Sequence, residues 1–119
     1  MAHKIIEIDD ALVSVRITDL FRLEDQLALQ KLATELIEKF NKLRILVVID
    51  QFQGWERNAE WDDVGFLMEH GDDIEKMAIV ADERWKDQAF LFIGKGFRAT
   101  EIEFFPPSAS REAEQWIRA

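Results

Sequence analysis

The stretch that decides the fold is Leu43–Ile49, L-R-I-L-V-V-I, together with residues 50–66 after it, D-Q-F-Q-G-W-E-R-N-A-E-W-D-D-V-G-F. The first part is nearly all apolar and rich in β-branched residues, which is typical of a central strand covered on both faces. We expect this strand to end at Asp50. The second part holds large aromatic residues and no Ser, Thr, Cys or His, although α/β proteins usually place ligand-binding groups after such a strand.

The sequence before this strand predicts a hairpin and a helix. Residues 4–8 alternate apolar and polar side chains, residues 9–10 signal a turn, and residues 12–17 continue as a second strand. One apolar stripe then recurs at the spacing of a buried helix face, and it consists of Leu29, Leu32, Ala33, Leu36, Ile37 and Phe40. Glu24 and Asp25 precede the stripe, where the helix dipole favours anions.

Helices and strands alternate in the sequence after the central strand. We expect helices at residues 58–70 and 83–93, a last helix from Ser108 or Ser110 to Ile117, and strands at 76–81 and 100–105. Such alternation implies strands joined by helical crossovers. We therefore predict a single α/β domain over residues 1–119, with a five-stranded, mostly parallel sheet, an N-terminal hairpin and four helices.

Composition narrows the class of protein. The chain has 119 residues, no cysteine and a net charge of −9. The absence of cysteine excludes a disulfide scaffold, a thiol nucleophile and a cysteine zinc site. The acidic balance makes nucleic acid an unsuitable partner and disfavours anionic membranes. No apolar run has the length of a signal peptide or a membrane span, so we expect a cytoplasmic protein.

Three motifs carry a family resemblance that spans nearly the whole chain. They are G-W-E-R-N-A-E-W-D-D at 54–63, A-I-V-A-D-E-R-W at 78–85 and E-A-E-Q-W-I at 112–117. Together they resemble the SpoIIAA-like family of bacterial proteins. The resemblance implies a STAS-type fold, also compared with CRAL-TRIO lipid-binding domains. It further implies a small domain without an established enzymatic activity, for which a lipid-like ligand or a membrane surface is the usual suggestion.

The chain departs from the regulatory relatives at one position. In relatives that antagonise anti-sigma factors, a serine follows the central strand and is phosphorylated. This sequence has no Ser or Thr between Lys42 and Ala99. A partner-switching role therefore stays open but lacks that trigger.

The aromatic residues are the main candidates for a ligand-binding or interface site. We select Phe52, Trp55, Trp61, Phe66, Trp85, Phe90 and Phe97. The alternative is that these residues are simply core, because aromatic stripes on helices usually pack against a sheet. A helix that is apolar almost all round at residues 89–93 has more apolar surface than one sheet contact needs, and such surface often marks a binding site.

A second set of residues suggests contact with a membrane surface. Residues 56–76 are strongly acidic, whereas residues 84–98 carry an excess of cations. The membrane-contact candidates combine aromatic or apolar side chains with nearby cations, and they are Phe90, Leu91, Lys95, Phe97 and Arg98. The alternative is a plain helix end with solvated cations.

The carboxylates offer a weaker case for chemistry. Asp50, Asp62 and Asp82 could meet at the strand ends as general acid and base groups, but helix capping explains them as well. His70 and the acidic residues around it match no dedicated metal site. No phosphate loop, nucleophile elbow or zinc signature occurs in the sequence. We therefore expect no catalytic residue, no metal and no cofactor.

Three hypotheses about function follow. The first is a non-enzymatic binding domain with an apolar cleft between the second and third helices, for a lipid-like or other hydrophobic ligand, with peripheral membrane association as an extension. The second is a regulatory protein–protein interaction module of STAS type without the phosphorylation serine. The third is a hydrolase or isomerase that uses Asp50 and Asp82. Exposed aromatic residues also suggest a homodimer.

Overall fold

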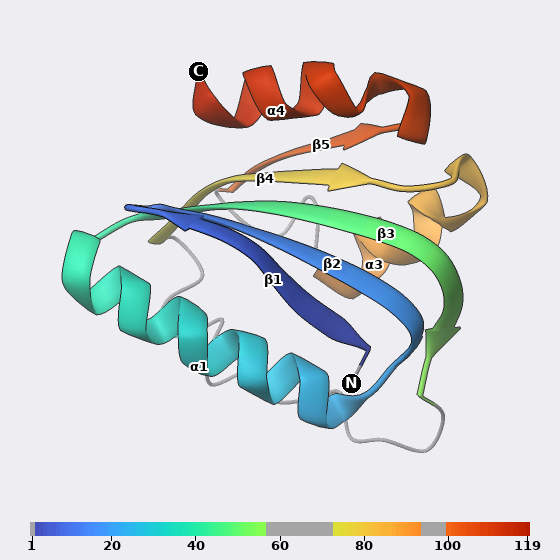
Figure 1. The fold of residues 1–119 in the computed structure, drawn as a ribbon, viewed down its shortest axis with the longest axis horizontal. Helices are drawn as coiled ribbons and strands as arrows, with labels where there is room; N and C mark the ends of the chain where they lie inside the picture. Colours follow the sequence, from blue (N-terminus) through green and yellow to red (C-terminus); the bar gives the residue numbers. More distant parts are fainter. Residues whose placement is uncertain (1, 57–72, 94–99) are drawn as a thin grey trace.

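The fold is a five-stranded sheet with helices on both faces, seen in a computed structural model that describes residues 2–56, 73–93 and 100–119 (Figure 1). For residues 91–93 only the backbone is described. The elements follow in the order β1 (His3–Asp9), β2 (Leu12–Phe21), α1 (Leu23–Phe40), β3 (Leu43–Trp55), β4 (Ile74–Val80), the 3₁₀ turn η2 (Glu83–Trp85), α3 (Lys86–Ile93), β5 (Glu101–Phe105), the 3₁₀ turn η3 (Pro107–Ala109) and α4 (Ser110–Arg118).

The five strands lie side by side in sequence order, β1-β2-β3-β4-β5. β1 is antiparallel to β2, which confirms the N-terminal hairpin, and the other three neighbouring pairs are parallel. The sheet is therefore mixed, and our description of it as mostly parallel is wrong in that respect. The physical reason is the short turn at Asp10, whose φ of 52° reverses the chain so that β2 runs back antiparallel beside β1, the edge strand.

The number of helices also needs correction. We expected four helices, whereas the described residues hold three α-helices, α1, α3 and α4. The expected helix at 58–70 lies outside the described residues. The expected helix at 83–93 is an α-helix only from Lys86 onward, because its first turn, Glu83–Trp85, is 3₁₀. The last helix begins at Ser110, one of the two expected starts.

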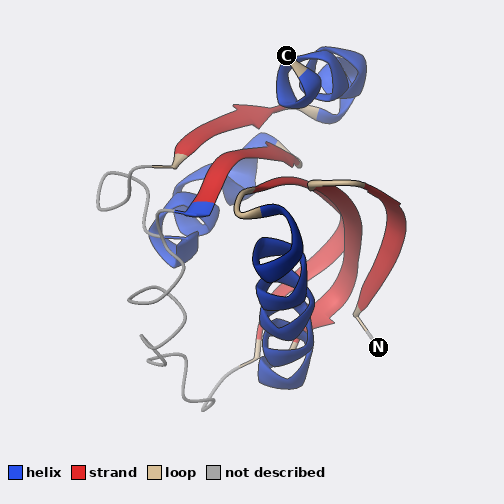
Figure 2. Ribbon diagram, turned by 90° about the vertical axis from the view of Figure 1, so that its left-hand side faces the viewer, coloured by secondary structure: helices blue, strands red, loops and turns tan. Residues whose placement is uncertain are grey.

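Strand alternation divides the apolar side chains between the two faces of the sheet. On the side of α1 and α3, Val13, Leu43 and Ile74 pack against Ala33, Leu36 and Ile37 of α1. On the opposite side, Leu46, Ala78 and Val80 pack against Ala113 and Ile117 of α4. Figure 2 shows α1 and α3 on one side of the sheet and α4 on the other. The apolar stripe predicted for α1 is confirmed.

The central strand is longer than we expected. β3 does not end at Asp50 but continues to Trp55, and it stays paired with β2 as far as Phe21 and Trp55. Both strands change register near the same level, and Asp19 and Gln51 have positive φ values of 57° and 50°. These left-handed residues let the two strands bend together, as the curved ends of β2 and β3 in Figure 1 show. The bend carries the first aromatic residues of the candidate site.

Candidate functional site

Three aromatic side chains meet beyond the carboxyl end of β4. The ring centroid of Phe52 lies 4.9 Å from that of Trp55 and 4.9 Å from that of Trp85, and the two tryptophans are 6.1 Å apart. All three pairs are edge-to-face, the arrangement that the charge distribution of aromatic rings favours. We call Phe52, Trp55 and Trp85 the aromatic cluster. The structure thus brings together three residues that the sequence analysis selected separately.

The bend of β3 sets the position of the aromatic cluster. Gly54 lies between two members of the cluster and has a φ of 102°, a conformation that L-residues with side chains rarely adopt. A Cβ atom at this position would be 3.9 Å from the Trp85 ring, which is ordinary contact. The glycine is therefore required for the backbone conformation and not for space.

The members of the aromatic cluster differ in exposure. Phe52 is 6% exposed and packs in the core with Val15, Ile17 and Phe21. Trp55 and Trp85 are half-buried at the edge of the same core. The Arg84 guanidinium lies over the Trp85 ring, 5.1 Å from its centroid. The inner side of the aromatic cluster is part of the core, as expected from the alternative that these aromatic residues only pack the fold. Its outer side also exposes part of the Trp55 and Trp85 rings.

Helix α3 adds a second aromatic contact. The Phe90 ring meets the Phe104 ring of β5 edge-to-face at 6.0 Å, and Lys86 Nζ lies 5.9 Å from both ring centroids. Ala89 is buried, whereas Phe90 is half-buried. Phe90 therefore helps to hold α3 on the sheet and is not simply an outward anchor.

The other selected residues fall where the structure gives no description. Trp61, Phe66, Lys95, Phe97 and Arg98 lie outside the described residues, and for Leu91 only the backbone is described. The cleft between the second and third helices and the membrane anchor thus stay predictions. Within the described part of the chain, no helix has both the length and the apolar character needed to cross a membrane.

The structure describes two of the three carboxylates that we expected to meet at the strand ends, and it gives them different surroundings. Asp82 accepts a hydrogen bond from the backbone N–H of Arg84 at 3.0 Å and so caps η2. Asp50 is exposed within β3, not beyond its end. Asp62 and His70 lie outside the described residues. Among residues 2–56, 73–93 and 100–119, no group of three or more His, Cys, Asp or Glu side chains could hold a metal ion.

A contact between the buried Asp25 and His3 at the start of α1 was not predicted from the sequence. The Asp25 carboxylate is 1% exposed, lies 2.5 Å from His3 Nδ1 and accepts the backbone N–H of Arg22 at 3.1 Å. Burial alone would raise the pKa of the Asp25 carboxyl, but the hydrogen bonds from His3 and Arg22 outweigh it, so its pKa is lowered. The pair ties β1 to α1. The acidic first turn was visible in the sequence, but the histidine partner depends on the tertiary fold.

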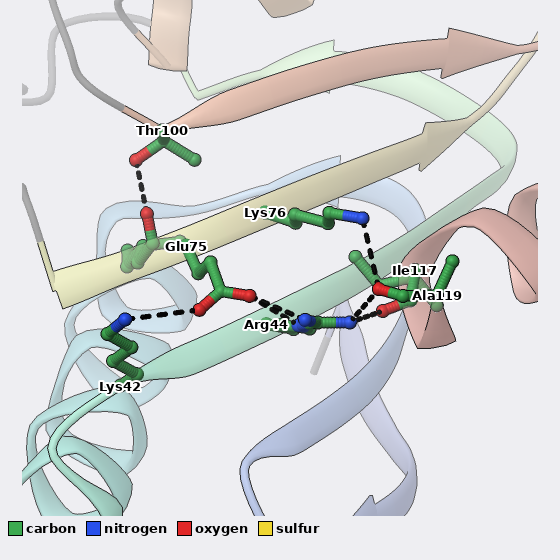
Figure 3. A network of polar contacts seen from close by, with 8 residues as sticks. Lys42, Arg44, Glu75, Lys76, Thr100, Ile117 and Ala119 are labelled. Carbon is green, nitrogen blue, oxygen red and sulfur yellow. Dashed lines mark hydrogen bonds and ion pairs between the residues drawn. The ribbon is translucent and has the colours of Figure 1, made fainter.

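The opposite side of the sheet carries a polar network at the end of α4 (Figure 3). Arg44 Nη2 lies 2.5 Å from Glu75 Oε1, and Arg44 Nη1 donates to the carbonyl oxygens of Ile117 and Ala119 at 2.9 and 2.6 Å. Lys76 Nζ donates to the Ala119 carbonyl oxygen at 3.2 Å. The Arg44 hydrogen bond lowers the pKa of the Glu75 carboxyl. Cations at the C-terminal carbonyls suit the helix dipole, so this network anchors α4.

The comparisons with known proteins agree with this architecture. A family model described as SpoIIAA-like matches residues 12–118. A crystal structure of an uncharacterized protein from the DUF3478 family, with a SpoIIAA-like fold, from Shewanella loihica PV-4, is similar with a TM-score of 0.70. That similarity covers 98% of this chain and 92% of the other at 21% sequence identity, so it bears on the fold alone. Comparison with curated protein sequences finds no significant match. The extent of the family match, on a sheet and helices of the expected kind, shows that this chain belongs to the SpoIIAA-like family.

Proposed function

We propose that this chain is a non-enzymatic binding domain whose aromatic cluster takes a lipid-like or other hydrophobic ligand. The observation that carries the proposal is the pair of half-buried tryptophans, Trp55 and Trp85, on a buried Phe52 at the bend of the sheet. Their rings offer rigid apolar surface backed by a firm core, which is what an apolar ligand requires of its site.

The position of the aromatic cluster supports the proposal. It lies beyond the carboxyl end of β4, next to the bend of β3, and ligands of open α/β sheets sit outside the carboxyl ends of strands. The residues that form it come from β3 and from η2, which follows β4. The cleft predicted between the second and third helices would adjoin this cluster, and peripheral contact with a membrane would extend it.

A regulatory protein–protein interaction module of STAS type is the second candidate. Membership in the SpoIIAA-like family favours it, because the fold suits such a module. The segment from Lys42 to Ala99 contains no Ser or Thr, so phosphorylation after the central strand cannot regulate it. A stoichiometric protein partner on the aromatic cluster would support this candidate over the first.

Tryptophan quenching tests the proposal directly. We would titrate the protein with a long-chain fatty acid brominated in mid-chain, and separately with phosphatidylcholine vesicles that carry brominated acyl chains. Bromine quenches indole fluorescence only at short range, so the two titrations distinguish a soluble ligand from a membrane surface. We expect quenching by at least one of the two probes and not by their unbrominated counterparts.

Two variants locate the quenched residues. Trp55→Phe/Trp85→Phe keeps aromatic surface at the site but removes its reporters, and we expect most of the quenching to disappear while native mass spectrometry still detects the bound fatty acid. Trp116→Phe is the matched control, because Trp116 belongs to α4 on the opposite side of the sheet. Absence of quenching by both probes, or loss of quenching in the control variant alone, would contradict the proposal.

A further inference from the structure

Two groups of cations on the α4 side of the sheet differ in how the chain pairs them. Arg44, Lys76 and Arg118 are satisfied by the chain itself. Arg44 binds Glu75 and two carbonyl oxygens, and Lys76 binds carbonyl oxygens of α4 and lies 4.9 Å from the Trp116 ring centroid. Arg118 binds Glu7 and Asp9 of β1 at 2.8 and 2.9 Å. These contacts show that the chain pairs three of its cations on this side, whereas Arg111 of α4 is exposed and has no ion pair with a described residue.

Lys4 and Arg16 form the second group. They are directly opposite each other on the antiparallel strands β1 and β2, and both are exposed. Neither side chain has an ion pair or a hydrogen bond with any residue that the structure describes. Like charges at directly opposed positions of a sheet are destabilising. The arrangement therefore has a cost that no contact within the described chain offsets.

A shortage of carboxylates does not explain the unpaired cations. The chain has 24 acidic residues against 15 lysines and arginines. On the same strand as Lys4, Glu7 and Asp9 are held by Arg118. Asp50 is exposed on β3, on the same face by strand alternation, yet no ion pair joins it to Arg16. Within the described part of the chain, Lys4 and Arg16 are therefore compensated by solvent alone, and an anion from outside the chain would relieve their mutual repulsion further.

This part of the sheet is also left open by the helices. In Figure 1 α4 lies over β3, β4 and β5, its described ion pairs with β1 are those of Arg118 with Glu7 and Asp9, and Figure 2 shows α1 and α3 on the other side. Arg16 is paired in register with Val48 of β3, which is half-buried because it packs against the core under α4, and Thr18 follows on the same face. We call this surface, which consists of Lys4, Arg16, Thr18 and Val48, the Lys4–Arg16 face.

We propose that the Lys4–Arg16 face docks an acidic segment of a protein partner. The planar guanidinium of Arg16 matches a carboxylate with two parallel hydrogen bonds, and the Lys4 ammonium adds a second charge beside it. Extended polyanions such as nucleic acid or an anionic membrane would meet the net charge of −9 over the rest of the surface. A short acidic segment touches only the local cations, while Asp50 accepts a donor from the same partner. This inference does not rest on the proposed ligand of the aromatic cluster, which lies on the other side of the sheet.

Nuclear magnetic resonance titration of the whole chain tests the docking. The probe is a synthetic peptide of alternating Glu and Val, and the control peptide has Gln in place of Glu. We expect the Glu peptide to shift amide signals of residues 3–6, 14–18 and 48–50, and the Gln peptide to leave them unchanged. Inorganic phosphate and phosphatidylglycerol vesicles are titrated in parallel to identify the other sources of negative charge.

Charge-reversal variants distinguish binding at the Lys4–Arg16 face from a general effect of the net charge of the protein. We expect Lys4→Glu/Arg16→Glu to weaken binding of the Glu peptide by about tenfold or more, since each contact of a charge pair is lost and replaced by repulsion. Lys31→Glu/Arg111→Glu makes the same change in net charge at two exposed residues of α1 and α4. We expect this control to bind the Glu peptide as the unmodified chain does.

The single variant Lys4→Glu adds a stability readout. It places a carboxylate opposite Arg16, so we expect its Tm to rise even as binding of the Glu peptide weakens. A fall in Tm would show that the Lys4 charge is already compensated, and it would overturn the proposal. So would the absence of shifts at millimolar Glu peptide, equal weakening in the control variant, or tighter binding of phosphate or vesicles than of the peptide at the same amides.

Discussion

Helices α1 and α3 lie on the same face of the sheet, but they are held there by very different contacts. α1 has 18 residues, and it buries Ala33, Leu36 and Ile37 against strands β2, β3 and β4. α3 has eight residues, it is entered through an exposed 3₁₀ turn, and its described contacts with the sheet come from Ala89 and Phe90.

The two helices therefore suit different roles. Local opening of a protein is easiest where few apolar contacts are buried. α1 supports the fold, whereas η2 and α3, which carry Trp85 and Phe90, form the part that would adjust to the proposed ligand. We therefore expect substitutions in α1 to reduce mainly the stability of the fold, and substitutions in η2 and α3 to reduce mainly binding of the proposed ligand.

The largest loss of stability is expected for Leu36→Ala. Leu36 is 8% exposed in the middle of the α1 stripe, so truncation removes apolar contacts and leaves a cavity. We expect the free energy of unfolding to fall by about 2–5 kcal/mol in urea denaturation. Leu27→Ala on the same helix is the control, because Leu27 is 46% exposed and should cost less than about 0.5 kcal/mol. Equal losses in the two variants would show that the buried face of α1 is assigned wrongly.

The polar anchor of α1 is tested by Asp25→Asn. The amide cannot accept from both His3 and the Arg22 N–H as the carboxylate does, so we expect a loss of roughly 1–3 kcal/mol at neutral pH. The pKa of Asp25 is lower in the folded chain than in the unfolded chain, so its contribution is full above the ordinary pKa. That contribution disappears as the pH falls from about 4 toward the folded pKa. The variant should show a shallower loss of stability over this acidic range, and an unchanged slope would contradict the assignment.

The bend that carries the aromatic cluster is tested by Gly54→Ala. A side chain at a φ of 102° strains the backbone even though space is available beside Trp85. We expect a loss of about 1–2 kcal/mol, together with a change in near-ultraviolet circular dichroism from the tryptophans. Gln53→Ala, at the exposed preceding residue of β3, should change neither. A fully stable Gly54→Ala protein would mean that the bend needs no glycine.

The smallest loss of stability is expected for Phe90→Ala on α3. Phe90 is half-buried, so Phe90→Ala should cost about 1 kcal/mol, less than Leu36→Ala. The same variant should also weaken binding of the brominated fatty acid to the folded protein. This weakening should be larger than the loss of folding stability accounts for. A loss as large as that of Leu36→Ala would place Phe90 in the core alone and remove it from the candidate site.

The elements with a regular pattern of apolar residues were predictable from the sequence. The stripe of α1 and the apolar run at Leu43–Ile49 follow directly from spacing and composition, and the structure confirms both. The extension of β3 to Trp55 was missed, because Gln51 adopts a left-handed conformation that nothing in its chemistry signals.

The candidate site was predictable in composition but not in geometry. The aromatic residues stood out in the sequence, yet the meeting of Phe52 and Trp55 with Trp85 depends on how the strand bends. The contacts of His3 with Asp25 and the opposition of Lys4 and Arg16 depend on tertiary structure and strand register, which a single sequence leaves undetermined.

Hydrogen exchange measured with and without a long-chain fatty acid tests the central claim most directly. We predict that amides of residues 83–93 exchange faster than those of α1 and of Leu43–Ile49 in the unliganded protein, and that the fatty acid slows residues 50–55 and 83–93 but not α4. Phe90→Asp/Phe97→Asp should stay folded and lose this slowing. If residues 83–93 are as well protected as α1 from the start and no fatty acid changes them, the hydrophobic-ligand account is contradicted and the interaction-module candidate replaces it.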